Sequence, residues 1–186
     1  MLPRGFTVFT IFVFAIVPHI IQGSGINEQD VQISMRSSPF ETALITLQKQ
    51  IGFTFQKIGL LRRAMTHASF SEENNKALSI LGSNIIETSA SLRLLGQNIE
   101  ISAKELSRRI SEVSKVESSC AADALRLGLH KVVRVSSKTN SSAPVVVCGA
   151  FRAIFGAIAL DVGKSDDAGS IFWVVHGGEV GGVMAM

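Results

Sequence analysis

The chain has 186 residues, a formal net charge of +3 and a hydrophobic content of 46%. This length gives room for one ordinary domain and a targeting segment, but not for two independent cores. The composition excludes a disordered chain. The slight charge excess predicts no strong electrostatic attraction to nucleic acid.

Residues 1–25 have the features of a signal peptide. Arg4 precedes an apolar run from Phe6 to Ile21 that contains no acid, and the triplet Gly23-Ser24-Gly25 suits signal peptidase. We predict cleavage near Gly25 and a location in the secretory pathway, in the endoplasmic reticulum lumen or secreted. An uncleaved anchor and a mitochondrial location are the alternatives. We expect no stable membrane span after cleavage, because the run is shorter than the ~20 residues that cross a bilayer.

The next segment, residues 26–37, is polar and aperiodic and is predicted to be a flexible lead. A helix over about 39–51 follows, because Ser38 can cap it, Pro39 suits its first turn and Gly52 can end it.

Apolar spacing then predicts four further helical stretches before residue 136, and a short last helix and a Gly-rich tail near the end of the sequence. These stretches are at about 58–65, at 76–95, from 102 to 113 and from 118 to 127, with a Ser-rich loop over 136–144. Residues 145–160 are almost wholly apolar, and their length favours a buried helix over a pair of buried strands. The last helix ends within 171–175, and residues 176–186 form the tail. We therefore predict an all-α domain over 38–175.

Two features of this domain concern covalent modification. Cys120 and Cys148 are too few for a disulfide framework or a zinc site, so we interpret them as buried free thiols, although an oxidising compartment would permit one disulfide between them. Asn140-Ser141-Ser142 is a glycosylation acceptor within the predicted loop.

Three local strings resemble the ribonuclease III domain from about residue 51 to residue 175. Ile51–Phe55 with Thr66–Phe70 looks like the family's Gly-aromatic turn and Thr-His-x-Ser-aromatic motif. Asn74–Ser83 resembles N-N-E-R-L-E-F-L-G-D, and Val147–Asp161 resembles L-A-D-A-L-E-A-L-I-G-A-I-Y-L-D. The resemblance implies a helical ribonuclease III-like fold.

The family's chemistry depends on acids of both helices that hold magnesium for phosphodiester hydrolysis. Those acidic positions fall on residues without a carboxylate: Lys76, Ser79, Ser83, Gly149 and Arg152. We therefore expect no catalytic residue, no metal site, no cofactor and no enzyme activity. Glu72, Glu73 and Asp161 are disfavoured as replacements because none lies on the required helix face, and an active nuclease with unorthodox ligands is equally disfavoured.

The resemblance also implies partners. Such domains pair, so we expect a homodimer or a heterodimer with another ribonuclease III-like chain. The likeness to short plant members with degenerate sites implies a role in nuclear fusion (karyogamy) during gametophyte development and fertilisation, through protein interaction. The alternative is an organellar protein that binds or processes double-stranded RNA. RNA binding is not favoured, because only 25 residues follow Asp161, too few for a double-stranded RNA binding domain.

We interpret His67 as a structural residue, and Arg108 and Arg109 as part of a solvent-exposed helix face.

Overall fold

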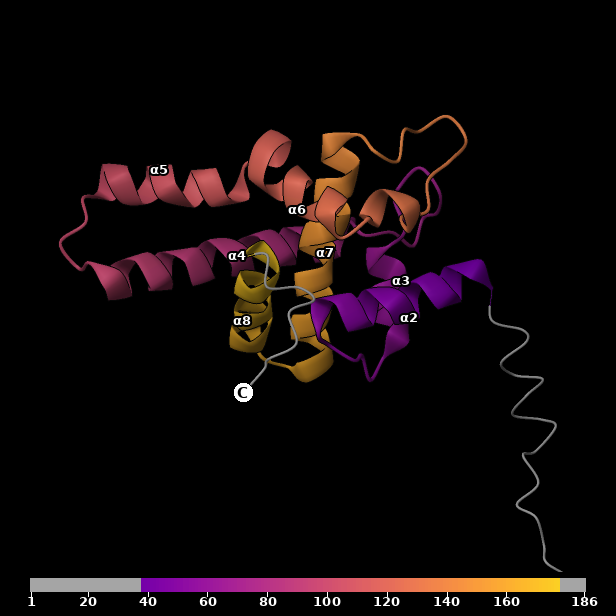
Figure 1. Cartoon of the computed structure of the whole chain (residues 1–186), viewed down its shortest axis with the longest axis horizontal. Coiled ribbons are helices and arrows are strands. Elements are labelled where there is room, and N and C mark those ends of the chain that lie inside the picture. Colours follow the sequence, from indigo (N-terminus) through magenta and orange to yellow (C-terminus); the bar gives the residue numbers. More distant parts are fainter. Residues whose placement is uncertain (1–37, 178–186) are drawn as a thin grey trace, which may run out of the picture. The chain divides into compact units, whose positions relative to one another are not determined.

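The computed structural model describes residues 38–177, and helices joined by turns and loops make up this range (Figure 1). Its helical segments are α2 (Pro39–Ile51), α3 (Ile58–Ala64), α4 (Lys76–Gln97), α5 (Ala103–Ser114), the π-helical turn η1 (Val116–Cys120), α6 (Ala121–Arg126), the 3-10 turn η2 (Leu129–Lys131), α7 (Pro144–Val162) and α8 (Ser165–His176). An isolated bridge between Thr66 and Arg134 is the only β-pairing among the described residues. The all-α prediction is confirmed. The predicted signal peptide and lead, and residues 178–186 of the predicted tail, lie outside the described residues.

Helix α2 begins and ends as its sequence predicts. The Ser38 hydroxyl accepts a hydrogen bond from the Glu41 amide at 3.3 Å, and Pro39 occupies the first turn. Gly52 adopts a φ of 67°, a left-handed conformation that only glycine enters without strain, and this stops the helix.

Helix α7 is the centre of the core. Phe151 and Phe155 of α7 are buried and meet Phe172 of α8 edge to face, with ring centroids 6.3 and 5.4 Å apart. Burying each such side chain stabilises the fold by roughly 1.5–3 kcal/mol. By length and composition α7 is apolar enough to cross a membrane, but 72% of its most apolar window is buried inside the domain. It is thus packed as a core helix, as predicted.

Helices α4 and α7 cross with their backbones in contact. A Cβ atom at Gly82 would lie 1.8 Å from the carbonyl oxygen of Arg152, and one at Gly156 would lie 2.2 Å from that of Leu78. Only glycine, whose side chain is a single hydrogen atom, fits at these two positions. The two glycines therefore determine how closely the helices approach. The crossing brings together the two helices that carry the predicted site positions.

The second half of α4 and α5 form an antiparallel hairpin that extends away from the rest of the domain (Figure 1). Ser102 caps α5, its hydroxyl accepting from the Glu105 amide at 3.2 Å. No residue of α5 is buried, and its apolar positions Leu106 and Ile110 are only partly covered. Helix α5 thus keeps an incompletely covered apolar side.

Candidate functional site

The predicted site positions meet at the crossing of α4 and α7. Lys76 is exposed at the start of α4, while Ser79 and Ser83 follow at helical spacing and are partly exposed. Gly82, beside Ser83, touches the backbone of Arg152. The structure therefore brings the segments 79–83 and 149–152 together, as the resemblance implies.

The polar side chains at this crossing bond to the protein itself. The Ser83 hydroxyl donates to a carboxylate oxygen of Glu87 at 3.3 Å. Arg152 donates from Nη2 to the carbonyl oxygen of Ser114 at 2.6 Å, and Ser114 is the last residue of α5. The final carbonyls of a helix lack partners within the helix and carry a partial negative charge. Arg152 therefore anchors the C-terminal end of α5 to α7.

The acids considered as replacements for the missing carboxylates either lie in an exposed loop or already accept hydrogen bonds from the backbone. Asp161 is buried, and its two oxygens accept hydrogen bonds from the backbone amides of Gln56 and Lys57 at 2.7 and 2.8 Å. This carboxylate holds the turn that precedes α3. Glu72 and Glu73 are exposed in the loop before α4. Within residues 38–177, no three His, Cys, Asp or Glu side chains form a group that could hold a metal ion.

His67 has the structural surroundings that its motif indicates. Its Nδ1 lies 2.9 Å from the Ser69 hydroxyl and accepts from the Ser69 amide at 3.1 Å. The Ser69 hydroxyl in turn accepts from the amide of Ser136 at 3.0 Å. The imidazole thus joins its own turn to the loop that precedes α7.

The two arginines of α5 form ion pairs on an exposed surface, as interpreted from the sequence. Arg108 donates to Glu105 at 2.6 Å and contacts Glu112, and Arg109 donates to Glu105 at 2.7 Å. Hydrogen bonds from Arg108, and then from Arg109, lower the pKa of Glu105 to about 2. The same contact with Glu105 raises the pKa of Arg108.

The two cysteines form a disulfide, and the interpretation as free thiols is wrong. Cys120 ends the π-helical turn η1 and Cys148 lies in α7, with their Cα atoms 5.3 Å apart, within the usual range for a disulfide. Both residues are buried, at 3% and 1% exposed. The sequence separates them by 28 residues and does not show that η1 packs on α7, which is why spacing alone left the pairing open.

A buried carboxylate that sequence reasoning missed joins α6 to α8. Asp123 is 4% exposed and accepts a hydrogen bond from Arg126 at 2.6 Å, and its other oxygen lies 2.6 Å from Nδ1 of His176. The imidazole of His176 stacks on Phe172 with a centroid distance of 5.2 Å. These contacts hold His176 in the last turn of α8, so the helix includes the first residue of the predicted tail.

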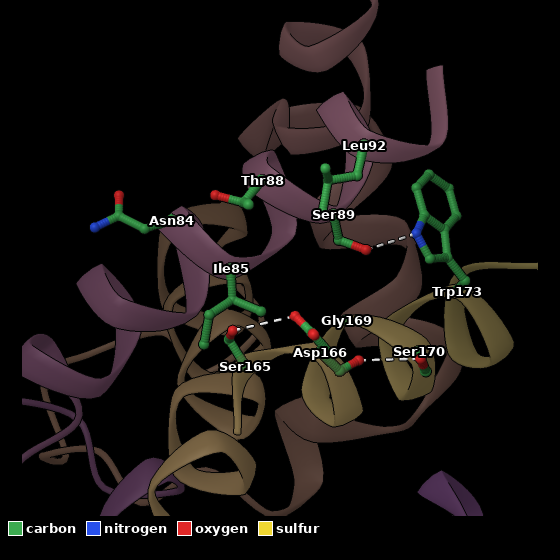
Figure 2. Close-up of a pocket in the computed structure, with 10 residues that line it drawn as sticks. All are labelled: Asn84, Ile85, Thr88, Ser89, Leu92, Ser165, Asp166, Gly169, Ser170 and Trp173. Carbon is green, nitrogen blue, oxygen red and sulfur yellow. Dashed lines mark hydrogen bonds between the residues drawn. The ribbon is translucent and has the colours of Figure 1, made fainter. Parts of the chain in front are cut away.

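A second missed feature is a pocket of about 320 Å³ between α4 and α8, shown in Figure 2. Trp173 closes one end, where its indole nitrogen donates to the Ser89 hydroxyl at 2.9 Å. Asn84 and Thr88 of α4 and Asp166 of α8 supply polar groups beside the apolar side chains of Ile85 and Leu92. The only signal in the sequence is the helical spacing of Asn84 and Thr88.

Comparison with known proteins identifies relatives of this chain. The family model described as ribonuclease-III-like matches residues 57–172. The protein named NUCLEAR FUSION DEFECTIVE 2 of Arabidopsis thaliana is 56% identical over 181 residues, covering 97% of this chain and 93% of that protein. Ribonuclease 3 of Thiobacillus denitrificans is 32% identical over 63% of this chain, but the chain spans only 53% of that enzyme's length.

Solved structures of ribonuclease III nuclease domains have the same fold as this chain. The nuclease domain of ribonuclease III from Campylobacter jejuni, in a structure described as flexible in a region involved in dimer formation, has a TM-score of 0.66 and 25% identity. The match covers 70% of this chain and 93% of that domain. The helices of this domain, their crossing and the family match agree, and the chain belongs to the ribonuclease-III-like family.

Proposed function

We propose that this protein is a non-catalytic ribonuclease III-like protein that acts in nuclear fusion during plant gametophyte development and fertilisation, through contacts with other proteins. The process comes from the name of the Arabidopsis thaliana relative, which is similar over almost its whole length. The proposed absence of catalysis rests on the residues at the α4–α7 crossing.

The contact between Arg152 and Ser114 carries the proposal. At a position where the family motif has an acid, this chain has a guanidinium group that donates to the end of α5 at 2.6 Å. Lys76 likewise puts a positive charge where the motif has a carboxylate. Magnesium takes oxygen ligands, chiefly carboxylates and phosphates, and is repelled by such cations. The site thus supports a structural role for the crossing.

The exposed surface of α4 supports pairing with a second ribonuclease III-like chain, either identical or related. Ile80 is 67% exposed, although it lies in the middle of the second motif at the place of the family's aromatic residue. Helix α5 adds its incompletely covered apolar side. Exposed apolar surface of this kind indicates a protein interface.

The buried disulfide supports a location in the secretory pathway. Disulfides form and persist in oxidising compartments and are rare in the cytosol. The Cys120–Cys148 bond lies within the core, so it belongs to the folded protein rather than to a surface that oxidises after isolation. This observation adds to the apolar leader that follows Arg4.

A nuclease assay tests the absence of catalysis. The domain beginning near Ile26 is incubated with double-stranded RNA and magnesium or manganese, beside a bacterial ribonuclease 3 as positive control. We expect no cleavage, no increase in melting temperature with either metal, and no salt-dependent RNA binding. Cleavage that a chelator abolishes would contradict the proposal. Tight, salt-dependent RNA binding without cleavage would favour the organellar RNA-binding alternative.

A surface variant tests the role in nuclear fusion. Arabidopsis thaliana plants that lack the relative are given either the unchanged chain, Ile80→Asp, or Val174→Asp, a control at another exposed apolar position. We expect the unchanged chain and the control to restore nuclear fusion, and Ile80→Asp to fail and to be monomeric by light scattering. Restoration by a monomeric Ile80→Asp protein would contradict pairing through α4.

A further inference from the structure

The loop that leads into α7 presents an asparagine in a glycosylation sequence. Asn140-Ser141-Ser142 has the pattern Asn-x-Ser, in which the middle residue is not proline. Asn140 is exposed. Pro144 begins α7 two residues after the sequence, so the acceptor lies outside the helical core.

The conformation of this loop favours recognition of Asn140. Its side-chain oxygen accepts a hydrogen bond from the amide of Ser142 at 2.9 Å, which is an Asx turn within the acceptor sequence itself. Its carbonyl accepts from the amide of Ala143 at 3.2 Å. The turn uses the amide oxygen, and no hydrogen bond of the described residues engages the side-chain nitrogen, which is the atom that glycosylation modifies.

The start of the same loop is held to the domain. The amide of Ser136 donates to the Ser69 hydroxyl at 3.0 Å, and the hydroxyls of Ser136 and Thr139 lie 3.0 Å apart. Asn140 is therefore displayed on a loop that is fixed at both ends. Its side chain stays exposed in the folded domain.

The disulfide gives independent evidence for the compartment. Cys148 lies eight residues after Asn140, and its bond to Cys120 is buried. A buried pair of thiols is oxidised while the chain folds, because the closed core excludes the oxidant. The place where this protein folds is then oxidising, as is the lumen in which asparagine glycosylation occurs.

We infer that Asn140 carries an N-linked glycan, an inference that rests on the proposed entry into the secretory pathway. A polyprenyl-diphosphate oligosaccharide is the donor. The side-chain nitrogen of Asn140 forms a bond to the anomeric carbon of the first sugar and loses one proton. The bond from that carbon to the lipid diphosphate breaks, and the diphosphate leaves with its electron pair. No oxidant or reductant is needed.

The loop that carries Asn140 lies far from the turn that joins α4 to α5. Figure 1 shows the loop before α7 at one end of the domain and the turn between α4 and α5 at the other. A glycan on Asn140 therefore leaves the exposed apolar side of α5 open.

Expression of the full chain in plant cells tests the inference, with a C-terminal tag that contains its own acceptor sequence. The chain is compared with Asn140→Gln, Ser142→Ala and Ser141→Ala, before and after a peptide N-glycosidase that acts on plant glycans. We expect two glycans on the unchanged chain and on Ser141→Ala, which keeps the acceptor pattern. We expect only the tag glycan on Asn140→Gln and Ser142→Ala.

Mass spectrometry gives a second readout that does not depend on the folding of any variant. The enzyme converts a glycosylated asparagine to aspartate, so the peptide with Asn140 changes mass when the unchanged chain is treated. A glycosylated tag with an unmodified Asn140 would overturn this inference and leave the proposed compartment standing. An unmodified tag together with an unmodified Asn140 would overturn both.

Discussion

Gly82 and Gly156 face each other across the contact between α4 and α7, and the Cβ that either residue lacks would overlap the other helix. A Cβ at Gly82 would lie 3.0 Å from the amide nitrogen of Gly156 and 1.8 Å from the carbonyl oxygen of Arg152. Backbone atoms cannot rotate aside as a side chain can. The distance between the helices is therefore fixed by these two residues.

Gly82→Ala should prevent or severely weaken folding, with a loss of about 3 kcal/mol or more in the free energy of unfolding, because the methyl group forces the helices apart. Gly96→Ala in the same helix is the control, since a Cβ there meets no atom within 4 Å. It should raise stability by up to about 1 kcal/mol, through higher helix propensity. Urea unfolding compares the two, and equal effects would show that the crossing is looser than described.

Asp161→Asn should lower the free energy of unfolding by about 1–3 kcal/mol, because two backbone amides in the turn before α3 lose a charged acceptor. An asparagine has one acceptor oxygen and no charge, so one amide stays unsatisfied. Glu73→Gln, an exposed change of the same kind, should have an effect within about 0.5 kcal/mol. A similar loss for both variants, measured by chemical denaturation, would argue against this role of Asp161.

Replacing both Cys120 and Cys148 by alanine should cost about 3–4 kcal/mol, from the loop of 28 residues that the disulfide closes in the unfolded chain. The unchanged protein should lose a similar amount in the presence of a reductant, whereas the alanine variant should be indifferent to it. Denaturation with and without dithiothreitol measures both effects. If the reductant destabilised the two proteins equally, the disulfide would not be the cause.

The low pKa of Glu105 should make the stability of the folded state depend on pH. Its folded value of about 2 lies below its ordinary value of 4.5, because Arg108 and Arg109 donate to its carboxylate. A lowered pKa stabilises the folded state above pH 4.5, and this contribution is lost as the pH falls from there towards 2. The carboxyl shift of Glu105 in an NMR titration should report this low pKa.

Salt and a second variant serve as controls for that titration. About 1 M salt should move the pKa of Glu105 back towards its ordinary value, since the ion pairs are exposed. Glu105→Gln should remove part of the stability difference between neutral and acid pH, and Glu117→Gln, an exposed residue just after α5, should not. An ordinary pKa for Glu105 at low salt would contradict the ion pairs.

The sequence predicted the helices where local chemistry decides their ends. Ser38, Pro39 and Gly52 set the bounds of α2 without reference to the rest of the chain. The apolar run of α7 likewise predicts a buried helix, because a helix that is buried on most sides is apolar over almost its whole length. The family strings then placed α4 and α7 together.

Features that depend on tertiary packing were not predictable in this way. The bond between Cys120 and Cys148 needs η1 to pack on α7, and the place of His176 depends on Asp123 from another helix. The Gly-rich stretch that begins at Gly177 led to a predicted tail that starts one residue before the end of α8. The pocket beside Trp173 arises from two helices whose contact no local pattern shows.

The contact from Arg152 to Ser114 bears on how such a protein can change over generations. If the position once held an acid, as in the family motif, a single return to glutamate would remove the anchor of α5 and place a negative charge beside the negative end of that helix. One restored carboxylate would not bind magnesium without the others. A return to an acid at position 152 would therefore weaken the hold on α5 before it could contribute to a metal site.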